Sequence, residues 1–331
     1  MRPRTALFTL LKAGAAACAV FVFAAAVAQA QDAKGPRGVV TIISPFAPGS
    51  APDVSARVLA PLLSERWATS VVVENKVGAN GNIAMASAAR AVPDGTTLIM
   101  APDTVFCINP HLYKSTSFDP GRDFVPVASV VSNQFLLLVH PSVKANDLAG
   151  FVALARAAKP PLLYASIGVG SLHQLAMEML KKRAGIELTH VPYRGGNATL
   201  TAIMGGEVQA AFSGAASAGI IASGKLKALA ISGTRRSAAF PDVPTLGETY
   251  PGLTVDAWMG LFAPAGMPES LLEKIRADVR DTLASPAFRD RINVSGNLEP
   301  LLLDVPAFKQ TIASDTAKYT AVLKELNIQE P

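Results

Sequence analysis

Short apolar runs recur along the chain after residue 35 and alternate with stretches in which apolar residues return every three or four positions. Several runs are continuously apolar, which is typical of strands buried on both faces. The alternation of strand and helix patterns predicts a mostly parallel α/β architecture. Strands are expected at 39–44, 71–75, 97–101, 135–140, 162–166, 188–193, 208–213, 226–232 and 259–265.

Between these runs, three stretches show the apolar face of a helix, and a fourth helix is expected at about 306–326. Gly185 follows the second stretch and predicts its end, since glycine is the usual residue just past a helix. The apolar faces consist of Val54, Val58, Leu59, Leu62 and Leu63; of Leu172, Leu175, Ala176, Met179 and Leu180; and of Leu271, Leu272, Ile275, Val279 and Leu283.

The first thirty residues have the pattern of a secretory signal peptide. A basic start is followed by an Ala/Val/Phe-rich run at 13–28 and by Ala28-Gln29-Ala30, a small-x-small cleavage site. The apolar run is shorter than the roughly 20 residues that span a bilayer. Cleavage after Ala30 is expected. Lipidation at Cys18 is the alternative, but apolar residues continue past it, which places it inside the apolar run rather than at a cleavage point.

Composition narrows the class of protein. Removing Arg2, Arg4 and Lys12 from the 30 basic residues leaves 27 against 25 acidic ones, so the formal net charge falls from +5 to +2. The sequence contains no Lys/Arg cluster of the kind that binds nucleic acid. Cys107 is the only cysteine after the signal segment, so no internal disulfide is expected, and neither cysteine nor histidine spacing suggests a metal site.

Four predicted strands end in turns rich in glycine and serine, at 46–53, 166–171, 193–197 and 212–215, and helices are expected to follow at least three of them. The carboxyl ends of parallel strands share one edge of a sheet, where ligands bind. Each helix start offers unpaired N–H groups and the positive end of a dipole, worth roughly 0.3–1 kcal/mol for an anion. The turns therefore predict a carboxylate or phosphate site that needs no lysine or arginine.

Structural interpretations of the same residues stay open. Ser171 and Gln174 form an S-x-x-Q capping box, and Asp53 has the chemistry of a helix N-cap. His190 lies within a predicted strand, where a satisfied core histidine is expected, and His173 lies close enough to the turns to contact a ligand. Trp258 and Tyr193 are typical core residues, although Tyr193 also ends a strand at the proposed edge.

Enzyme signatures are weak. No phosphate-binding P-loop or complete dinucleotide fingerprint is present. Ser217, in ASAG, faintly resembles a nucleophile elbow. A hydrolase that uses the same turns is the alternative, and it requires a histidine such as His173 beside Ser171 or Ser217, with an acid behind it.

The order of motifs along the chain resembles the Bug (TctC-like) family, the extracytoplasmic solute receptors of tripartite tricarboxylate transport systems. The similarity is colinear and covers nearly the whole chain after the signal. It is carried by residues 45–53, 71–84, 93–98, 109–113, 164–176, 190–196, 224–236, 240–248 and 260–268.

The resemblance implies a type II periplasmic binding-protein fold, in which two α/β lobes close on a small carboxylate. Lobe 1 would take 36–134 and 259–331, lobe 2 would take 135–258, and the crossings would fall near 135–140 and 259–265. The protein would be a monomeric, non-enzymatic periplasmic receptor without a cofactor or metal, which delivers its ligand to membrane permease subunits. A sensory receptor that presents its ligand to a membrane kinase is the alternative.

Carried over by position, the resemblance also implies the ligand-binding residues. They are Phe46, Ala47, Gly49, Ser50 and Asp53 in the first turn; Ser166, Gly168, Gly170, Ser171 and Gln174 in the second; and Tyr193, Gly195 and Ser213.

The chain departs from the family pattern at two positions. Ser50 stands where a second glycine is usual, and it adds a hydroxyl group while losing the freedom to adopt positive φ. Ser213 stands where many members have an aspartate that could pair with a ligand ammonium group. We therefore expect a mono- or dicarboxylate, aliphatic or aromatic, rather than an amino acid.

Overall fold

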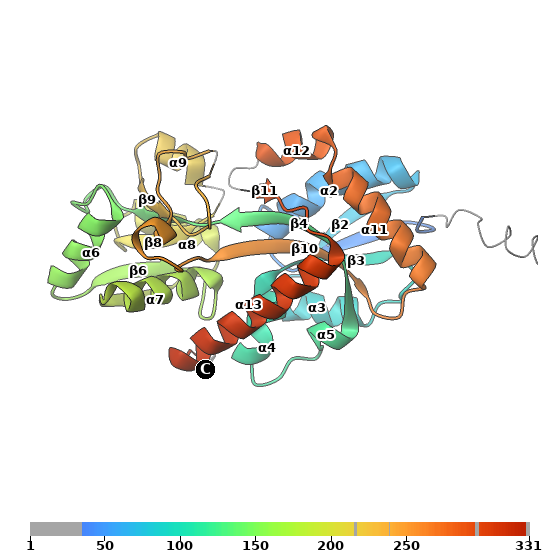
Figure 1. The fold of residues 1–331 in the computed structure, drawn as a ribbon, viewed down its shortest axis with the longest axis horizontal. Helices are drawn as coiled ribbons and strands as arrows, with labels where there is room; N and C mark the ends of the chain where they lie inside the picture. Colours follow the sequence, from blue (N-terminus) through green and yellow to red (C-terminus); the bar gives the residue numbers. More distant parts are fainter. Residues whose placement is uncertain (1–34, 215–216, 238, 295–297, 329–331) are drawn as a thin grey trace, which may run out of the picture. The chain divides into compact units, whose positions relative to one another are not determined.

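The computed structural model describes residues 35–214, 217–237, 239–294 and 298–328. Within this part of the chain the strands form two sheets, and helices cover them (Figure 1). The expected signal segment 1–30 and Cys18 lie outside the described residues. Among the described residues, no helix combines the length and apolar character that crossing a membrane requires.

The first sheet has six strands in the order β11-β4-β10-β3-β1-β2. β1 pairs in parallel with β2 and β3, so the turn after each of these strands lies at one edge, whereas β10, β4 and β11 join the sheet antiparallel. The strands are β1 (Val40–Ser44), β2 (Val71–Asn75), β3 (Thr97–Pro102), β4 (Phe124–Gln134), β10 (Asp256–Pro264) and β11 (Leu298–Pro300).

The second sheet has five strands in the order β7-β6-β8-β5-β9. β6 pairs in parallel with β7 and β8, and β5 runs antiparallel to β8 and β9. The strands are β5 (Leu136–Val139), β6 (Leu162–Ser166), β7 (Leu188–Pro192), β8 (Ala210–Ser213) and β9 (Lys227–Ile231).

All nine predicted strands are present, but the sheets are mixed rather than mostly parallel. Each parallel pair includes at least one strand that carries a glycine turn. Sequence reading missed β4 and β11. The antiparallel pairing of β4 with β10 and β11, and of β5 with β8 and β9, could not be predicted because no local pattern encodes it.

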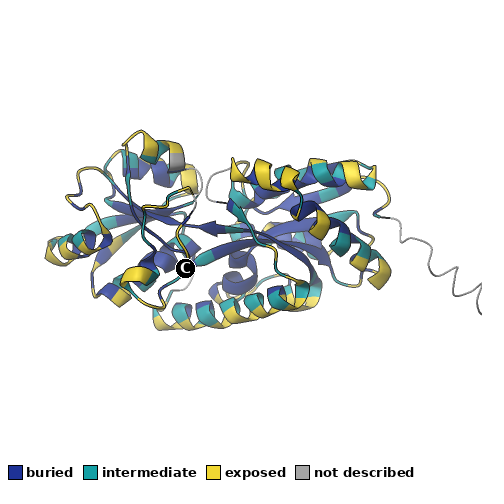
Figure 2. Cartoon of the chain, turned by 45° about the horizontal axis from the view of Figure 1, so that its top comes forward, coloured by how far each residue is buried: buried dark blue, intermediate teal, exposed yellow. Residues whose placement is uncertain are grey.

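The helices present buried faces to the sheets and exposed faces outward, as the colouring in Figure 2 shows. The predicted faces of α7 and α11 are confirmed, except that Met177 is buried where Met179 was expected, and Gly185 ends α7 at φ 60°. The helices are α2 (Ala51–Trp67), η1 (Ala79–Gly81), α3 (Asn82–Ala89), the π-helical turn η2 (Thr104–Ile108), α4 (Asn109–Leu112), α5 (Pro120–Asp123), α6 (Leu148–Ala157), α7 (Leu172–Ala184), α8 (Gly196–Met204), α9 (Ala218–Ala222), α10 (Leu246–Thr249), α11 (Glu269–Leu283), α12 (Pro286–Asn293) and α13 (Val305–Glu325).

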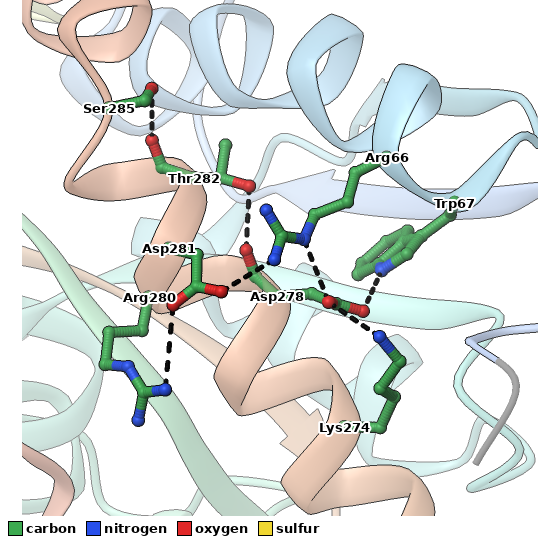
Figure 3. Close-up of polar contacts among 8 residues, drawn as sticks. All are labelled: Arg66, Trp67, Lys274, Asp278, Arg280, Asp281, Thr282 and Ser285. Carbon is green, nitrogen blue, oxygen red and sulfur yellow. Dashed lines mark hydrogen bonds and ion pairs between the residues drawn. The ribbon is translucent and has the colours of Figure 1, made fainter. Parts of the chain in front are cut away.

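A buried carboxylate joins α2 to α11 (Figure 3). Asp278, 2% exposed, accepts hydrogen bonds from Arg66 Nε at 2.8 Å, Trp67 Nε1 at 2.8 Å and Lys274 Nζ at 2.9 Å. Burial opposes the ionisation of Asp278, but these three donors outweigh it and hold its pKa below the usual value. The end of α2 opposite the first glycine turn is thereby attached to its neighbouring helix.

The chain crosses from the first sheet to the second at Phe135 and returns between β9 and β10. Ser232 connects the two crossings: its hydroxyl accepts from the Phe135 N–H at 2.9 Å and donates to the Val255 carbonyl at 2.6 Å. Its own N–H donates to the Phe135 carbonyl, and its carbonyl accepts from the Val255 N–H. Both crossing segments are therefore hydrogen-bonded to the same buried serine. The exact lobe boundaries, 134/135 and 258/259, stay a prediction.

Candidate ligand-binding site

The first glycine turn, 45–50, connects the end of β1 to the start of α2. Ser50 is the N-cap residue of α2, with φ −70° and ψ 158°. The turn places its positive φ at Gly49, at 83°, so serine at position 50 adopts an unstrained backbone. Replacing the second glycine of the family pattern therefore costs this chain no backbone strain.

Asp53 holds the first turn in place. Its carboxylate accepts from the Gly49 N–H at 2.9 Å, from Arg57 Nε at 3.0 Å and from Asn75 Nδ2 at 2.8 Å. Asn75 Nδ2 also donates to the Phe46 carbonyl at 2.9 Å. Burial opposes ionisation, but these donors lower the pKa of Asp53. Ser50, not Asp53, is the N-cap, and the Asp53 carboxylate is occupied within the turn.

Two hydroxyl groups at this end of β1 have no partner among the described residues. They are Ser44 Oγ and Ser50 Oγ, both buried, and Ser50 makes no side-chain capping bond to α2. A buried hydroxyl without a partner costs roughly 1–3 kcal/mol, which a ligand or ordered water that supplies the hydrogen bond would recover. Of the turn residues, Phe46 is half-buried, and Ala47 and Gly49 are exposed.

The second turn, 166–171, connects β6 to α7 and is held by a dense set of internal bonds. The Gly168 N–H donates to Ser166 Oγ at 3.1 Å, the Gly170 N–H to Gln174 Oε1 at 2.7 Å and the Ser171 N–H to the Gly168 carbonyl at 3.3 Å. Three N–H groups of the turn are thus satisfied internally. The Val169 N–H has no acceptor among the described residues, and the first N–H groups of α7 have none within their helix.

The capping interpretation of Ser171 and Gln174 is confirmed in modified form. Ser171 Oγ accepts from the Gln174 N–H at 3.3 Å and donates to the Gly168 carbonyl at 2.7 Å. The Gln174 side chain reaches the N–H of Gly170 instead of the N-cap N–H, so it braces the glycine turn as well as the helix start.

Sequence reading placed His190 in the core without a role, but its ring contacts the second turn. His190 Nε2 lies 2.7 Å from Ser166 Oγ, which also donates to the Gly168 carbonyl at 2.9 Å. The ring stacks on Tyr164, with centroids 4.9 Å apart and planes at 23°. Burial lowers the pKa of His190, so its neutral form is favoured.

The third turn follows β7 and is hydrogen-bonded to the backbone of Ser166. The Tyr193 N–H and the Thr199 hydroxyl both donate to the Ser166 carbonyl, at 2.9 and 3.2 Å. The Tyr193 hydroxyl donates to Glu207 at 3.2 Å, and Gly195, with φ 93°, is the N-cap of α8. Tyr193 and Gly195 therefore lie with the second turn, as expected for one sheet edge.

Ser213 ends β8, the strand that pairs with β6. Its hydroxyl lies 2.9 Å from Ser217 Oγ, and because the single Ser217 proton goes to the Gly214 carbonyl, Ser213 is the donor of this hydroxyl pair. A Cβ placed on Gly214 would lie 3.2 Å from the Asn133 side chain, so this turn packs against β4. The site residues thus fall into a first-turn group on one sheet and a group of second, third and β8 turns on the other.

Two contacts join the second turn and the start of α7 to segments that neighbour the first sheet, although neither contact includes the first turn. Gly170, with φ 73°, packs so closely on Leu112 that an added Cβ would lie 2.1 Å from Leu112 Cδ2. The His173 ring lies 4.3 Å from the Phe135 ring at the crossing. Burial lowers the pKa of His173 to about 4, and its Nδ1 has no partner among the described residues. No hydrogen bond among those residues joins the first turn directly to the second.

A further turn, at the end of β3, escaped sequence reading because it contains no glycine. Asp103, 1% exposed, accepts from the Thr104 N–H at 2.7 Å through Oδ1, while Oδ2 has no partner among the described residues. Burial, together with the nearby Asp315 charge, raises the pKa of Asp103 to about 8. An uncharged carboxylic acid therefore lies at this edge at neutral pH.

Neither a metal-ligand cluster nor a Ser–His–acid triad is found among the described residues. The described residues contain no group of three or more His, Cys, Asp or Glu placed to hold a metal ion. Within the same residues, His173 makes no hydrogen bond to Ser171 or Ser217. Ser166 and His190 form a close pair, but Glu178 bonds Tyr164 and Lys181 instead of standing behind the imidazole, and Ser166 is fully buried.

The fold is that of the two-lobed periplasmic binding proteins, and solved structures support this class. R. palustris Rpa4515, solved with adipate, aligns with a TM-score of 0.81 at 28% identity, over 89% of this chain and 99% of that one. The periplasmic binding protein BugD aligns with a TM-score of 0.78 at 28% identity, over 89% and 100%. MatC from Rhodopseudomonas palustris, solved with bound malate, aligns with a TM-score of 0.75 at 29% identity, over 87% and 99%.

Residues 55–328 match the family described as tripartite tricarboxylate transporter family receptor. The chain belongs to this family of solute-binding receptors, as its motifs predicted.

Proposed function

We propose that this protein captures a small mono- or dicarboxylate, aliphatic or aromatic, between the first-turn group and the second-turn group. The observation that carries the proposal is the unpartnered Ser50 hydroxyl at the N-terminus of α2. An anion there would meet the hydroxyl and the free N–H groups and dipole of the helix start. On the other sheet, the Val169 N–H and the start of α7 would supply the second set of donors.

The ligand would stabilise closure of the lobes because it contacts both groups only when they approach each other. The chain links the two sheets through crossings that share Ser232, which suits a hinge. We propose 36–134 with 259–331 and 135–258 as the moving units. The ligand contacts proposed from the sequence are Phe46, Ala47, Gly49, Ser50, Asp53, Ser166, Gly168, Gly170, Ser171, Gln174, Tyr193, Gly195 and Ser213.

The ligand class follows from the charges at the β8 turn. Ser213 and Ser217 pair as neutral hydroxyls, so this turn has no carboxylate for an ammonium group. The homologous proteins solved with adipate and malate agree with an uncharged or hydroxylated carbon chain between carboxylates. We therefore expect deaminated dicarboxylates to bind more tightly than the matching amino acids.

Thermal unfolding of the refolded, ligand-free protein tests this proposal. Succinate is compared with aspartate, glutarate with glutamate, and adipate, malate, citrate, benzoate, nicotinate and terephthalate complete the panel. A ligand at a hundredfold excess over its dissociation constant should add about 2.7 kcal/mol of stability. Tighter binding of aspartate than of succinate contradicts the ligand class, and no rise with any carboxylate contradicts the site.

We further propose that the mature protein is a periplasmic monomer that delivers its ligand to a tripartite tricarboxylate-type permease. Family membership supports this role. Uptake of the identified carboxylate into cells with and without the gene is the test. Unchanged uptake in cells without the protein would contradict delivery.

A further inference from the structure

We propose that His190 is a positioning residue for anion capture: its hydrogen bond to Ser166 holds the turn 166–171 in the conformation that presents α7 and Val169 to a carboxylate. The role in anion capture rests on the proposed function, but the effect of His190 on the conformation of the turn can be tested without ligand.

The orientation of the His190 ring is determined by its neighbours. β6 and β7 pair in register, with Tyr164 opposite His190, and their rings stack. The Tyr164 hydroxyl donates to Glu178 at 2.5 Å, and Lys181 Nζ contacts the same carboxylate at 2.8 and 2.9 Å. Tyr164 on β6 and the Glu178–Lys181 pair on α7 therefore hold the imidazole with Nε2 directed at Ser166.

Ser166 transmits this orientation to the glycine turn. Its hydroxyl has one proton and three close partners: His190 Nε2, the Gly168 N–H and the Gly168 carbonyl. All three contacts are hydrogen bonds only if Nε2 carries a proton and donates to Ser166, because the serine proton then points to the Gly168 carbonyl. The Nε2–H form of His190 thus completes the network.

Gly168 is where the network controls the turn. Its φ of 138° lies in a region that only glycine adopts easily, so local backbone preference does not hold this conformation. Its N–H and carbonyl are both held by Ser166, and the carbonyl also receives the Ser171 hydroxyl and N–H. Losing the His190 donor frees Ser166 to rotate and loosens the start of α7.

Amide hydrogen exchange of the ligand-free protein tests the positioning role. His190→Leu removes Nε2, His190→Gln retains a donor, and His140→Leu removes a histidine–serine contact elsewhere in the chain as the matched control. We expect exchange at Gly168 and Ser171 to be about tenfold faster in His190→Leu, as for the loss of one hydrogen bond, and to return toward the original rate in His190→Gln. Amides in the middle of α7 should not change.

Calorimetric titration with adipate tests whether His190 contributes to anion binding. Affinity should fall about tenfold in His190→Leu and recover in His190→Gln. Unchanged exchange at Gly168 in His190→Leu overturns the positioning role. Faster exchange with unchanged adipate affinity overturns its link to capture. If the original protein binds no carboxylate, the proposed function fails, and the exchange rates still decide whether His190 holds the turn.

Discussion

The contact between Gly170 and Leu112 makes a quantitative prediction for Gly170→Ala. The new Cβ would lie 2.1 Å from Leu112 Cδ2 and 2.9 Å from Cδ1, and Leu112 is only 4% exposed. Displacing a packed side chain costs about 1–3 kcal/mol. A non-glycine residue at φ 73° adds roughly 1–2 kcal/mol. We therefore expect Gly170→Ala to lower the free energy of unfolding by about 2–5 kcal/mol.

Gly185 provides a matched control, because its φ is 60° and an added Cβ would meet no atom within 4 Å. Gly185→Ala should cost only the backbone strain, about 1–2 kcal/mol. Leu112→Ala removes the obstructing methyl groups at a cost of about 2–5 kcal/mol by itself. In the double variant the steric part disappears, so the two effects should fall short of additive by about 1–3 kcal/mol.

Urea unfolding of the wild type and the four variants, compared through midpoints at constant slope, gives these free energies. The steric explanation is refuted if Gly170→Ala is no worse than Gly185→Ala, or if Gly170→Ala and Leu112→Ala are additive. Either result would mean that α4 and the second turn can separate at little cost. Their contact would then not restrain the approach of the two sheets.

Further predictions concern buried polar groups. Asp278→Ala should lower the free energy of unfolding by about 2–3 kcal/mol, and solvent keeps the loss this small because the side chains of Arg66 and Lys274 are 37% and 39% exposed. Asp281 is half-exposed, so Asp281→Asn should lower the free energy of unfolding by less than about 0.5 kcal/mol in the same urea assay. Because the pKa of Asp278 is lowered, its contribution is present above the unfolded value of 3.8 and is lost as the pH falls through the folded value. The pH dependence from Asp103 has the opposite sign, because its pKa is raised to about 8 and its contribution to stability is lost as the pH rises from 4 to 8. Asp103→Asn should therefore be more stable than wild type at pH 8 by about 2 kcal/mol or more, but not at pH 4. Ser232→Ala should lower the free energy of unfolding by about 1–3 kcal/mol because it leaves the buried Phe135 N–H unpaired. A free energy of unfolding equal to that of wild type would mean that water replaces the hydroxyl.

The amino-acid sequence by itself determined the elements that depend on local pattern. Apolar runs identified the nine strands, and the three-and-four spacing identified the faces of α7 and α11, because burial imposes these periods wherever an element packs. Gly185 marked the end of α7, and Ser171 with Gln174 marked its start, because helix ends are satisfied by residues close in sequence. The family resemblance, confirmed by the match over 55–328, added the two-lobed arrangement.

Only the tertiary structure decided which groups remain available to a ligand. Asp53 and Gln174 belong to the turns by sequence, but their side chains are occupied within those turns, while Ser50 Oγ has no partner among the described residues. His190 lies 24 residues from Ser166, and their bond exists only because β6 and β7 pair in register. Leu112 against Gly170, and Ser232 between the crossings, depend likewise on contacts between distant segments. Local sequence encodes propensity and periodicity, whereas the partner of a hydrogen-bonding group depends on which distant segments the whole core brings together.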